Sequence, residues 1–85
     1  MAQVTKQIHE LTTNEWTTYR SENGMAFNVN ADDHEPGDEW GSFTVHFLDN
    51  GRWASGHSMS FSNTTPEILR TMIEHWAATI ALANS

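Results

Sequence analysis

The residues in this sequence that could do chemistry gather in one short acidic stretch, positions 32–39. The stretch holds five of the chain's eleven acidic residues and contains no Lys or Arg. Its sequence is Asp32-Asp33-His34-Glu35-Pro36-Gly37-Asp38-Glu39. Carboxylates at this density can ligate a hard cation, exchange protons with a substrate, or attract a positively charged protein surface.

Metal binding requires a particular spacing of the acids. A calcium loop of the helix-loop-helix kind needs acids at its first, third and fifth positions, a Gly at the sixth and a Glu at the twelfth. In this stretch Pro36 interrupts the run, and no series of positions fits that pattern. We therefore expect no metal site and no cofactor.

Catalysis requires partners for the acids. His34 lies beside Glu35, and the chain has five His residues that could act as general acid or base. The sequence lacks Cys, a Gly-x-Ser-x-Gly elbow, a phosphate-binding loop and a His-Glu-x-x-His motif. Thr44 and His46 fall on one solvated strand face, which by itself indicates no chemistry. We predict that the chain is not an enzyme and has no catalytic residues.

Recognition of a basic protein surface needs the fewest additional features. Charges steer the encounter, and an exposed aromatic residue can anchor the contact. Trp40 directly follows the acids and precedes Gly41, so it either closes the rim of the core or stands out as an anchor. The alternative without a binding function is that the acids form a solvated connection that keeps the protein soluble. The predicted partner-binding residues are Asp32, Asp33, Glu35, Asp38, Glu39 and Trp40, with Glu22 and Asp49 added if the hairpin tips lie nearby.

Composition limits the class of protein and of partner. A chain of 85 residues has room for one domain, residues 1–85, and nine aromatic residues supply volume for a core. The absence of Cys and of an apolar leader or spanning run predicts a soluble, cytoplasmic protein. A net charge of −7 predicts repulsion from nucleic acid and from anionic membranes, and attraction to a protein with a basic surface.

Alternating residues predict two β-hairpins, at about 15–31 and 42–62. In the first hairpin, Glu22-Asn23-Gly24 separates an aromatic and β-branched run from a run with Met25, Phe27 and Val29 on one face. A three-residue loop with Gly24 in the left-handed position sets Tyr19 opposite Phe27.

The second hairpin repeats this pattern around Asp49-Asn50-Gly51. A two-residue turn would place Trp53, Met59 and Phe61 on the face opposite Phe43, Val45 and Phe47. We therefore expect a three-residue bulged loop, which pairs Phe47 with Trp53 and Val45 with Ser55 and gathers the apolar set on one face. Gly56 is the expected site of a further bulge.

The C-terminal segment, about 66–82, is predicted to be a helix. Thr65 is a suitable N-cap, Pro66 suits the first helical position, and Glu67 complements the helix dipole. A short helix is expected at about 3–11. The predicted fold is α+β, a four-stranded antiparallel sheet of two hairpins packed on the C-terminal helix, and an uncovered sheet edge makes a homodimer possible. The predicted apolar helix stripe comprises Ile68, Leu69, Met72, Ile73, Trp76 and Ile80.

In size and charge the chain is similar to the small inhibitors that phages encode against host nucleases, including anti-CRISPR proteins and DNA mimics. This resemblance is one of composition and covers no specific motif. It implies a phage or mobile-element anti-defence protein that covers a basic nucleic-acid-binding surface, such as that of a nuclease or nucleoprotein complex. An immunity or antitoxin protein that neutralises a toxin has the same size and acidity, and a structural or assembly component is a third alternative.

Overall fold

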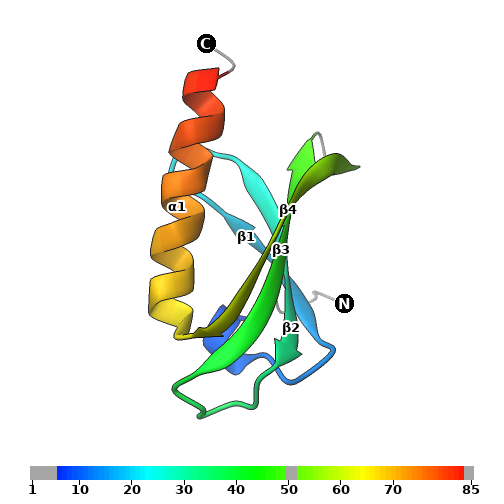
Figure 1. Ribbon diagram of the computed structural model, residues 1–85, viewed down its shortest axis with the longest axis vertical. Helices are drawn as coiled ribbons and strands as arrows, with labels where there is room; N and C mark the ends of the chain where they lie inside the picture. Colours follow the sequence, from blue (N-terminus) through cyan, green and yellow to red (C-terminus); the bar gives the residue numbers. More distant parts are fainter. Residues whose placement is uncertain (1–5, 50–51, 84–85) are drawn as a thin grey trace, which may run out of the picture.

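The computed structural model describes residues 6–49 and 52–83. A turn of 3-10 helix, η1 (Ile8–Glu10), is followed by four strands, β1 (Trp16–Arg20), β2 (Ala26–Asp33), β3 (Gly41–Asp49) and β4 (Arg52–Thr64), and by helix α1 (Pro66–Ala83). The strands form one antiparallel sheet in the order β1-β2-β3-β4. Helix α1 covers one face of this sheet (Figure 1). The predicted α+β architecture is confirmed.

The N-terminal helix is shorter than expected. In place of a helix over residues 3–11, the described residues contain only the single turn η1. In an α-helix the carbonyl of Lys6 would accept from the amide of Glu10, but it accepts from Thr17 Oγ1 of β1 at 2.6 Å. The Glu10 amide instead donates to Gln7 O at 3.0 Å, which tightens the turn.

The first hairpin has the predicted loop and register. Tyr19 pairs with Phe27, the Ser21 amide donates to Met25 O at 2.8 Å, and the Gly24 amide donates to Ser21 O at 3.0 Å. Gly24 has φ = 89°, a conformation that a residue with a Cβ rarely adopts. The three-residue loop is confirmed.

The second hairpin differs from the prediction. Asp49 pairs with Arg52 and Leu48 with Trp53, so the turn contains two residues, and the pairings of Phe47 with Trp53 and Val45 with Ser55 are wrong. Farther along, Val45 pairs with Met59 and His46 with Ser58. Residues 54–57 therefore face the single residue Phe47, an irregularity that includes Gly56 as expected. This irregularity, rather than a longer turn, returns the apolar side chains of β4 to the core face. The side chain of Trp53 lies outside the described residues.

The core lies between the sheet and α1. Leu69, Ile73 and Ala77 are fully buried at a spacing of four residues, and the Trp76 ring lies 5.2 Å from that of Phe27. The sheet contributes Phe27, Val29, Ala31, Phe43 and Val45, and the N-terminal segment adds Ile8 and Leu11.

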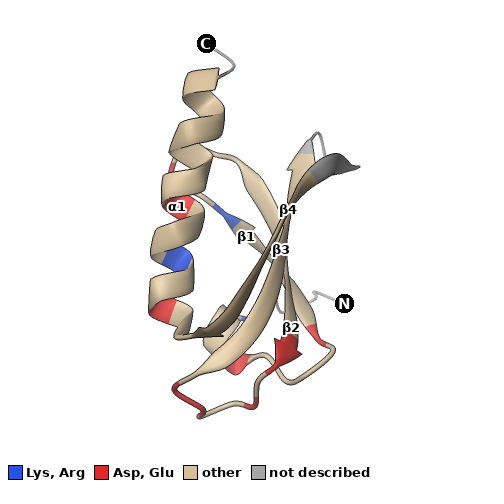
Figure 2. Cartoon of the chain, in the orientation of Figure 1, with Lys and Arg blue, Asp and Glu red and all other residues tan. Residues whose placement is uncertain are grey.

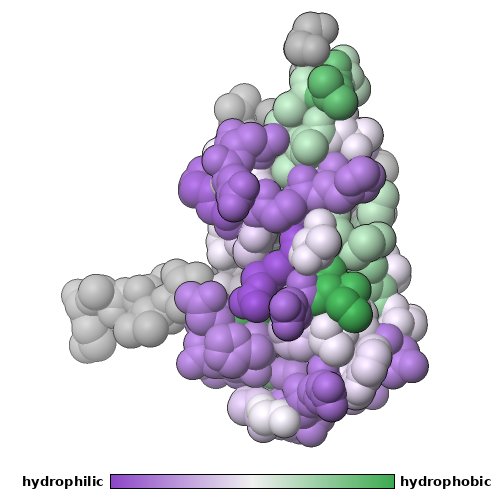
Figure 3. Space-filling view, turned by 90° about the vertical axis from the view of Figure 1, so that its left-hand side faces the viewer, coloured by the Kyte–Doolittle hydropathy of each residue, from purple (hydrophilic) through white to green (hydrophobic). Residues whose placement is uncertain are grey.

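The predicted apolar stripe of the helix includes two residues that are not buried. Ile68 and Met72 are 49% and 47% exposed, because the buried line follows Leu69 and Ile73. Figure 3 shows the side of the molecule on which α1 lies, where hydrophobic areas are interspersed with hydrophilic ones. None of the helices in residues 6–49 and 52–83 is long and apolar enough to cross a membrane.

The start of α1 agrees with the predicted caps. Thr65 Oγ1 accepts from the Ile68 amide at 3.0 Å, and Pro66 opens the helix. The cap fixes the direction in which α1 leaves β4, and it places the first turn of the helix beside the connection between β2 and β3 (Figure 1).

Candidate protein-docking site

The acidic stretch, residues 32–39, ends β2 and crosses to β3 at one end of the sheet. Figure 2 shows Asp and Glu residues gathered at this end of the molecule. All five carboxylate side chains of the stretch are exposed, and so is Trp40, at 51%. Because half of its surface is exposed, Trp40 stands out from the core, and its role as an anchor stays a prediction. The exposed residues are Asp32, Asp33, Glu35, Asp38, Glu39 and Trp40.

His34 is the one buried residue of the stretch, with 1% of its surface exposed. Its Nδ1 lies 2.6 Å from Leu11 O and its Nε2 lies 3.1 Å from Asp38 O, while the ring contacts Phe43 at a centroid distance of 5.2 Å. The backbone is also tied, because Thr13 N donates to His34 O at 2.7 Å. His34 therefore joins the stretch to the segment before β1, and a substrate cannot reach its ring.

The protonation of His34 bears on this anchor. Carbonyl oxygens can only accept hydrogen bonds, so both ring contacts are hydrogen bonds only when the ring carries two protons. A neutral ring donates to one of the two carbonyls, and the Leu11 carbonyl is the closer. In either form the buried ring holds the stretch against the segment before β1.

The stretch is shaped by local hydrogen bonds as well. The Asp38 amide donates to Glu35 O at 2.9 Å, and the Glu35 amide donates to Asp38 Oδ2 at 3.3 Å across a turn in which Gly37 has φ = 95°. Asp32 Oδ2 accepts from Thr44 Oγ1 at 2.5 Å. The Asp32 and Asp38 carboxylates thus hold the connection in place, whereas no side-chain bond to Asp33, Glu35 or Glu39 occurs among the described residues.

Gly41 allows the chain to pass close to the buried histidine. A Cβ on Gly41 would lie 2.7 Å from His34 Cδ2 and 2.9 Å from Asp33 O, both shorter than real contacts. Any other residue would displace His34 or the end of β2. In the sequence Gly41 was notable only as the residue after Trp40, and no pattern indicated that it would lie against His34.

The fold brings residues from elsewhere in the chain to the acidic stretch. A cavity of about 290 Å³ lies between the stretch and the start of α1, and its lining includes Asp38, Glu39, His9 and Glu67. From the sequence, Glu67 was expected only to complement the helix dipole. The N-cap at Thr65 fixes where α1 begins, and therefore where Glu67 lies. We call the acidic stretch together with Glu67 the acidic end.

The other two predicted binding residues lie far from the acidic end. In a meander of this order, the β1–β2 and β3–β4 turns share the end of the sheet opposite the β2–β3 connection (Figure 1). Eight residues of β2 separate the two ends, a length of about 25 Å. The Glu22 amide donates to Glu74 Oε1 at 3.1 Å, and the side chain of Asp49 lies outside the described residues.

One of the remaining candidates contacts the acidic stretch, since Thr44 Oγ1 donates to Asp32 Oδ2. Thr44 and His46 lie on the sheet face opposite the core, and His57 is exposed with its ring 5.9 Å from that of Phe47. Across the described ranges, no group of three His, Asp or Glu side chains could hold a metal ion.

No known family model, no curated protein and no solved structure matches this chain.

Proposed function

We propose that this chain is a protein-binding inhibitor that docks its acidic end on a basic, nucleic-acid-binding surface of another protein. The observation that carries the proposal is the buried His34, which holds an otherwise fully exposed acidic connection in one conformation. A solvated connection needs no such anchor. A docking surface benefits from one, because less conformational entropy is lost on binding.

The proposed mechanism is electrostatic and steric competition with nucleic acid. Asp33, Glu35 and Glu39 have carboxylates that can accept hydrogen bonds from the partner's Lys and Arg, in place of phosphates. Trp40 supplies an apolar anchor beside them, since half of its surface is exposed. Asp32, Asp38 and Glu67 add negative potential. The partner we propose is a nuclease or nucleoprotein complex, the kind of target expected for an anti-defence protein of a phage or mobile element.

An immunity or antitoxin function uses the same acidic end against a basic toxin. The two functions differ in genetic setting: a neighbouring toxin gene favours immunity, and a phage or mobile-element setting favours anti-defence. An assembly component would instead form a large closed oligomer, which sedimentation detects.

The test is partner capture with two charge-matched variants. The first, Glu35→Lys with Glu39→Lys, alters the acidic end at residues without local hydrogen bonds. The second, Glu22→Lys with Asp49→Lys, alters the opposite end. Each raises the net charge by four units, from −7 to −3. Proteins recovered from host lysate are identified by mass spectrometry.

We expect the wild type and the Glu22/Asp49 variant to recover the same basic protein and the Glu35/Glu39 variant to lose it. Recovery of that protein by all three chains would refute docking through the acidic end. Equal loss from both variants would show that only total charge matters.

A further inference from the structure

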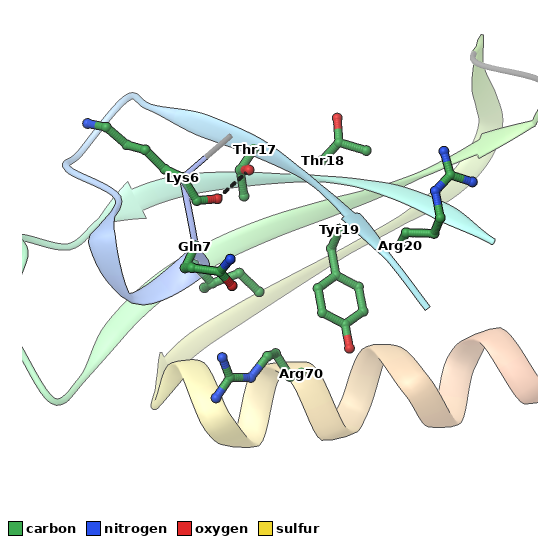
Figure 4. Close-up of a pocket in the computed structure, with 8 residues that line it drawn as sticks. Lys6, Gln7, Thr17, Thr18, Tyr19, Arg20 and Arg70 are labelled. Atoms are coloured by element: carbon green, nitrogen blue, oxygen red, sulfur yellow. Dashed lines mark hydrogen bonds between the residues drawn. The ribbon is translucent and has the colours of Figure 1, made fainter. Parts of the chain in front are cut away.

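A second cavity lies between η1, β1 and α1 (Figure 4). Its volume is about 230 Å³. Three of the chain's four Lys and Arg residues line it, although the net charge of the protein is −7. They are Lys6, Arg20 and Arg70. This local charge is opposite in sign to that of the whole molecule.

The three cations are not equivalent. Lys6 Nζ lies 2.8 Å from Glu15 Oε2, Arg20 Nη1 donates to Gly24 O at 3.2 Å, and both side chains extend away from the cavity (Figure 4). The Arg70 side chain instead extends along α1 toward Gln7, under β1 (Figure 4). Within residues 6–49 and 52–83, its guanidinium has no hydrogen bond and no ion pair. Arg70 is therefore the charge that the cavity offers to a ligand.

The rest of the lining combines the apolar surfaces of Ile8 and Tyr19 with the polar residues Gln7, Thr17 and Thr18. The Tyr19 ring stands beside Arg70 (Figure 4), and Ile8, 2% exposed, contributes an aliphatic wall. The carboxylate of Glu74 already accepts two hydrogen bonds, from Tyr19 Oη at 2.5 Å and from the Glu22 amide. Glu74 does not line the cavity.

We propose that this cavity binds a small organic carboxylate with an apolar body. A guanidinium presents parallel N–H donors that match the two oxygens of a carboxylate, and a partly enclosed site strengthens that pairing. The apolar body would lie against Ile8 and the Tyr19 ring. The volume is below the usual range for drug-sized ligands, so the ligand is about the size of a single-ring aromatic acid. Arg70 also lines the cavity beside the acidic end, but the proposed binding uses none of the acidic residues there and does not depend on the proposed function.

The experiment is an amide NMR titration of the full chain with sodium benzoate at constant ionic strength. We expect saturable shifts at Gln7, Ile8, Tyr19 and Arg70. The neutral analogue benzamide is the ligand control, because it has the ring but not the charge. Arg70→Gln should weaken benzoate binding by about tenfold or more, the order expected for a charge-assisted hydrogen bond.

Two further variants separate the charge of Arg70 from its geometry. Arg20→Gln, in which the lost guanidinium extends away from the cavity, should bind benzoate as the wild type does. Arg70→Lys keeps the charge, loses the planar fork and should bind more weakly than the wild type. The proposal is overturned if benzamide shifts the same amides equally, if no saturable shift occurs, or if Arg20→Gln and Arg70→Gln lose the same affinity.

Discussion

At the scale of single residues, His34 and Gly41 act as one unit. The ring of His34 fills the space that a Cβ on Gly41 would need, and its two nitrogens lie 2.6 Å from Leu11 O and 3.1 Å from Asp38 O. The sequence places His34 among five acids, where it looks like part of the exposed chemistry. Its burial follows from contacts with Leu11 and Phe43, which are far away in the chain and have no local signature.

Gly41→Ala tests this close approach. We expect it to lower the free energy of unfolding by about 1–3 kcal/mol, the usual cost of forcing atoms into a filled space. In a His34→Ala background the same change should cost less, because the ring that the new Cβ meets is absent. Chemical denaturation of the four chains measures the coupling. Additive costs would contradict the contact.

Tyr19 is the chain's single tyrosine, so its titration can be followed without interference. Burial, and then its hydrogen bond to Glu74, raise the pKa of Tyr19 from 10.0 to about 12. The unfolded chain thus loses this proton at a lower pH than the folded chain. The stabilisation is complete below about pH 10 and is lost as the pH rises toward 12.

Tyrosinate absorbance should accordingly show a midpoint near 12. Glu74→Gln should lower this midpoint but leave it above 10, since burial is the larger of the two causes. A wild-type midpoint near 10 would contradict the buried, hydrogen-bonded phenol.

At the scale of elements, local signals predicted what local interactions decide. Asn23-Gly24 correctly predicted the first hairpin, and Thr65-Pro66 correctly predicted the start of α1. Both features are set by the conformational preferences of adjacent residues. The register of the second hairpin was wrong because an irregularity within β4 can restore the faces as well as a longer turn can. Choosing between them depends on packing against α1, which local sequence does not encode.

The helix offers a matched pair of isoleucines to test which of its faces is buried. Ile73 is fully buried and Ile68 is 49% exposed. Ile73→Ala should cost about 2–5 kcal/mol of unfolding free energy, and Ile68→Ala distinctly less. Thermal and denaturant unfolding of the two variants compare them directly. Equal costs would mean that α1 packs through a different face.

At the scale of the whole molecule, charge is divided between regions. Acidic residues gather where β2, β3 and the start of α1 meet (Figure 2), whereas the cavity between η1, β1 and α1 is lined by Lys6, Arg20 and Arg70. The sequence indicated the acidic stretch from its composition. It did not indicate Glu67 or the cavity, because both depend on where α1 crosses the sheet. β1 and β4 are the edges of this sheet, and pairing of an edge with a second copy stays a prediction.

Charge reversal at the acidic end should leave the fold intact. Glu35 and Glu39 are exposed, so the Glu35→Lys, Glu39→Lys variant should unfold within about 0.5 kcal/mol of the wild type. Circular dichroism during denaturation checks this. A large loss of stability would mean that these carboxylates support the fold and that reduced binding has a structural cause.

The most direct test of docking through the acidic end is the equilibrium affinity for the captured partner, measured at increasing salt for the wild type and both charge-matched variants. We predict that wild-type affinity falls steeply with salt, because the pairing is between exposed charges. The Glu22/Asp49 variant should follow the wild type, and the Glu35/Glu39 variant should bind weakly at every salt concentration. Wild-type affinity in the Glu35/Glu39 variant, or affinity independent of salt, would contradict the account.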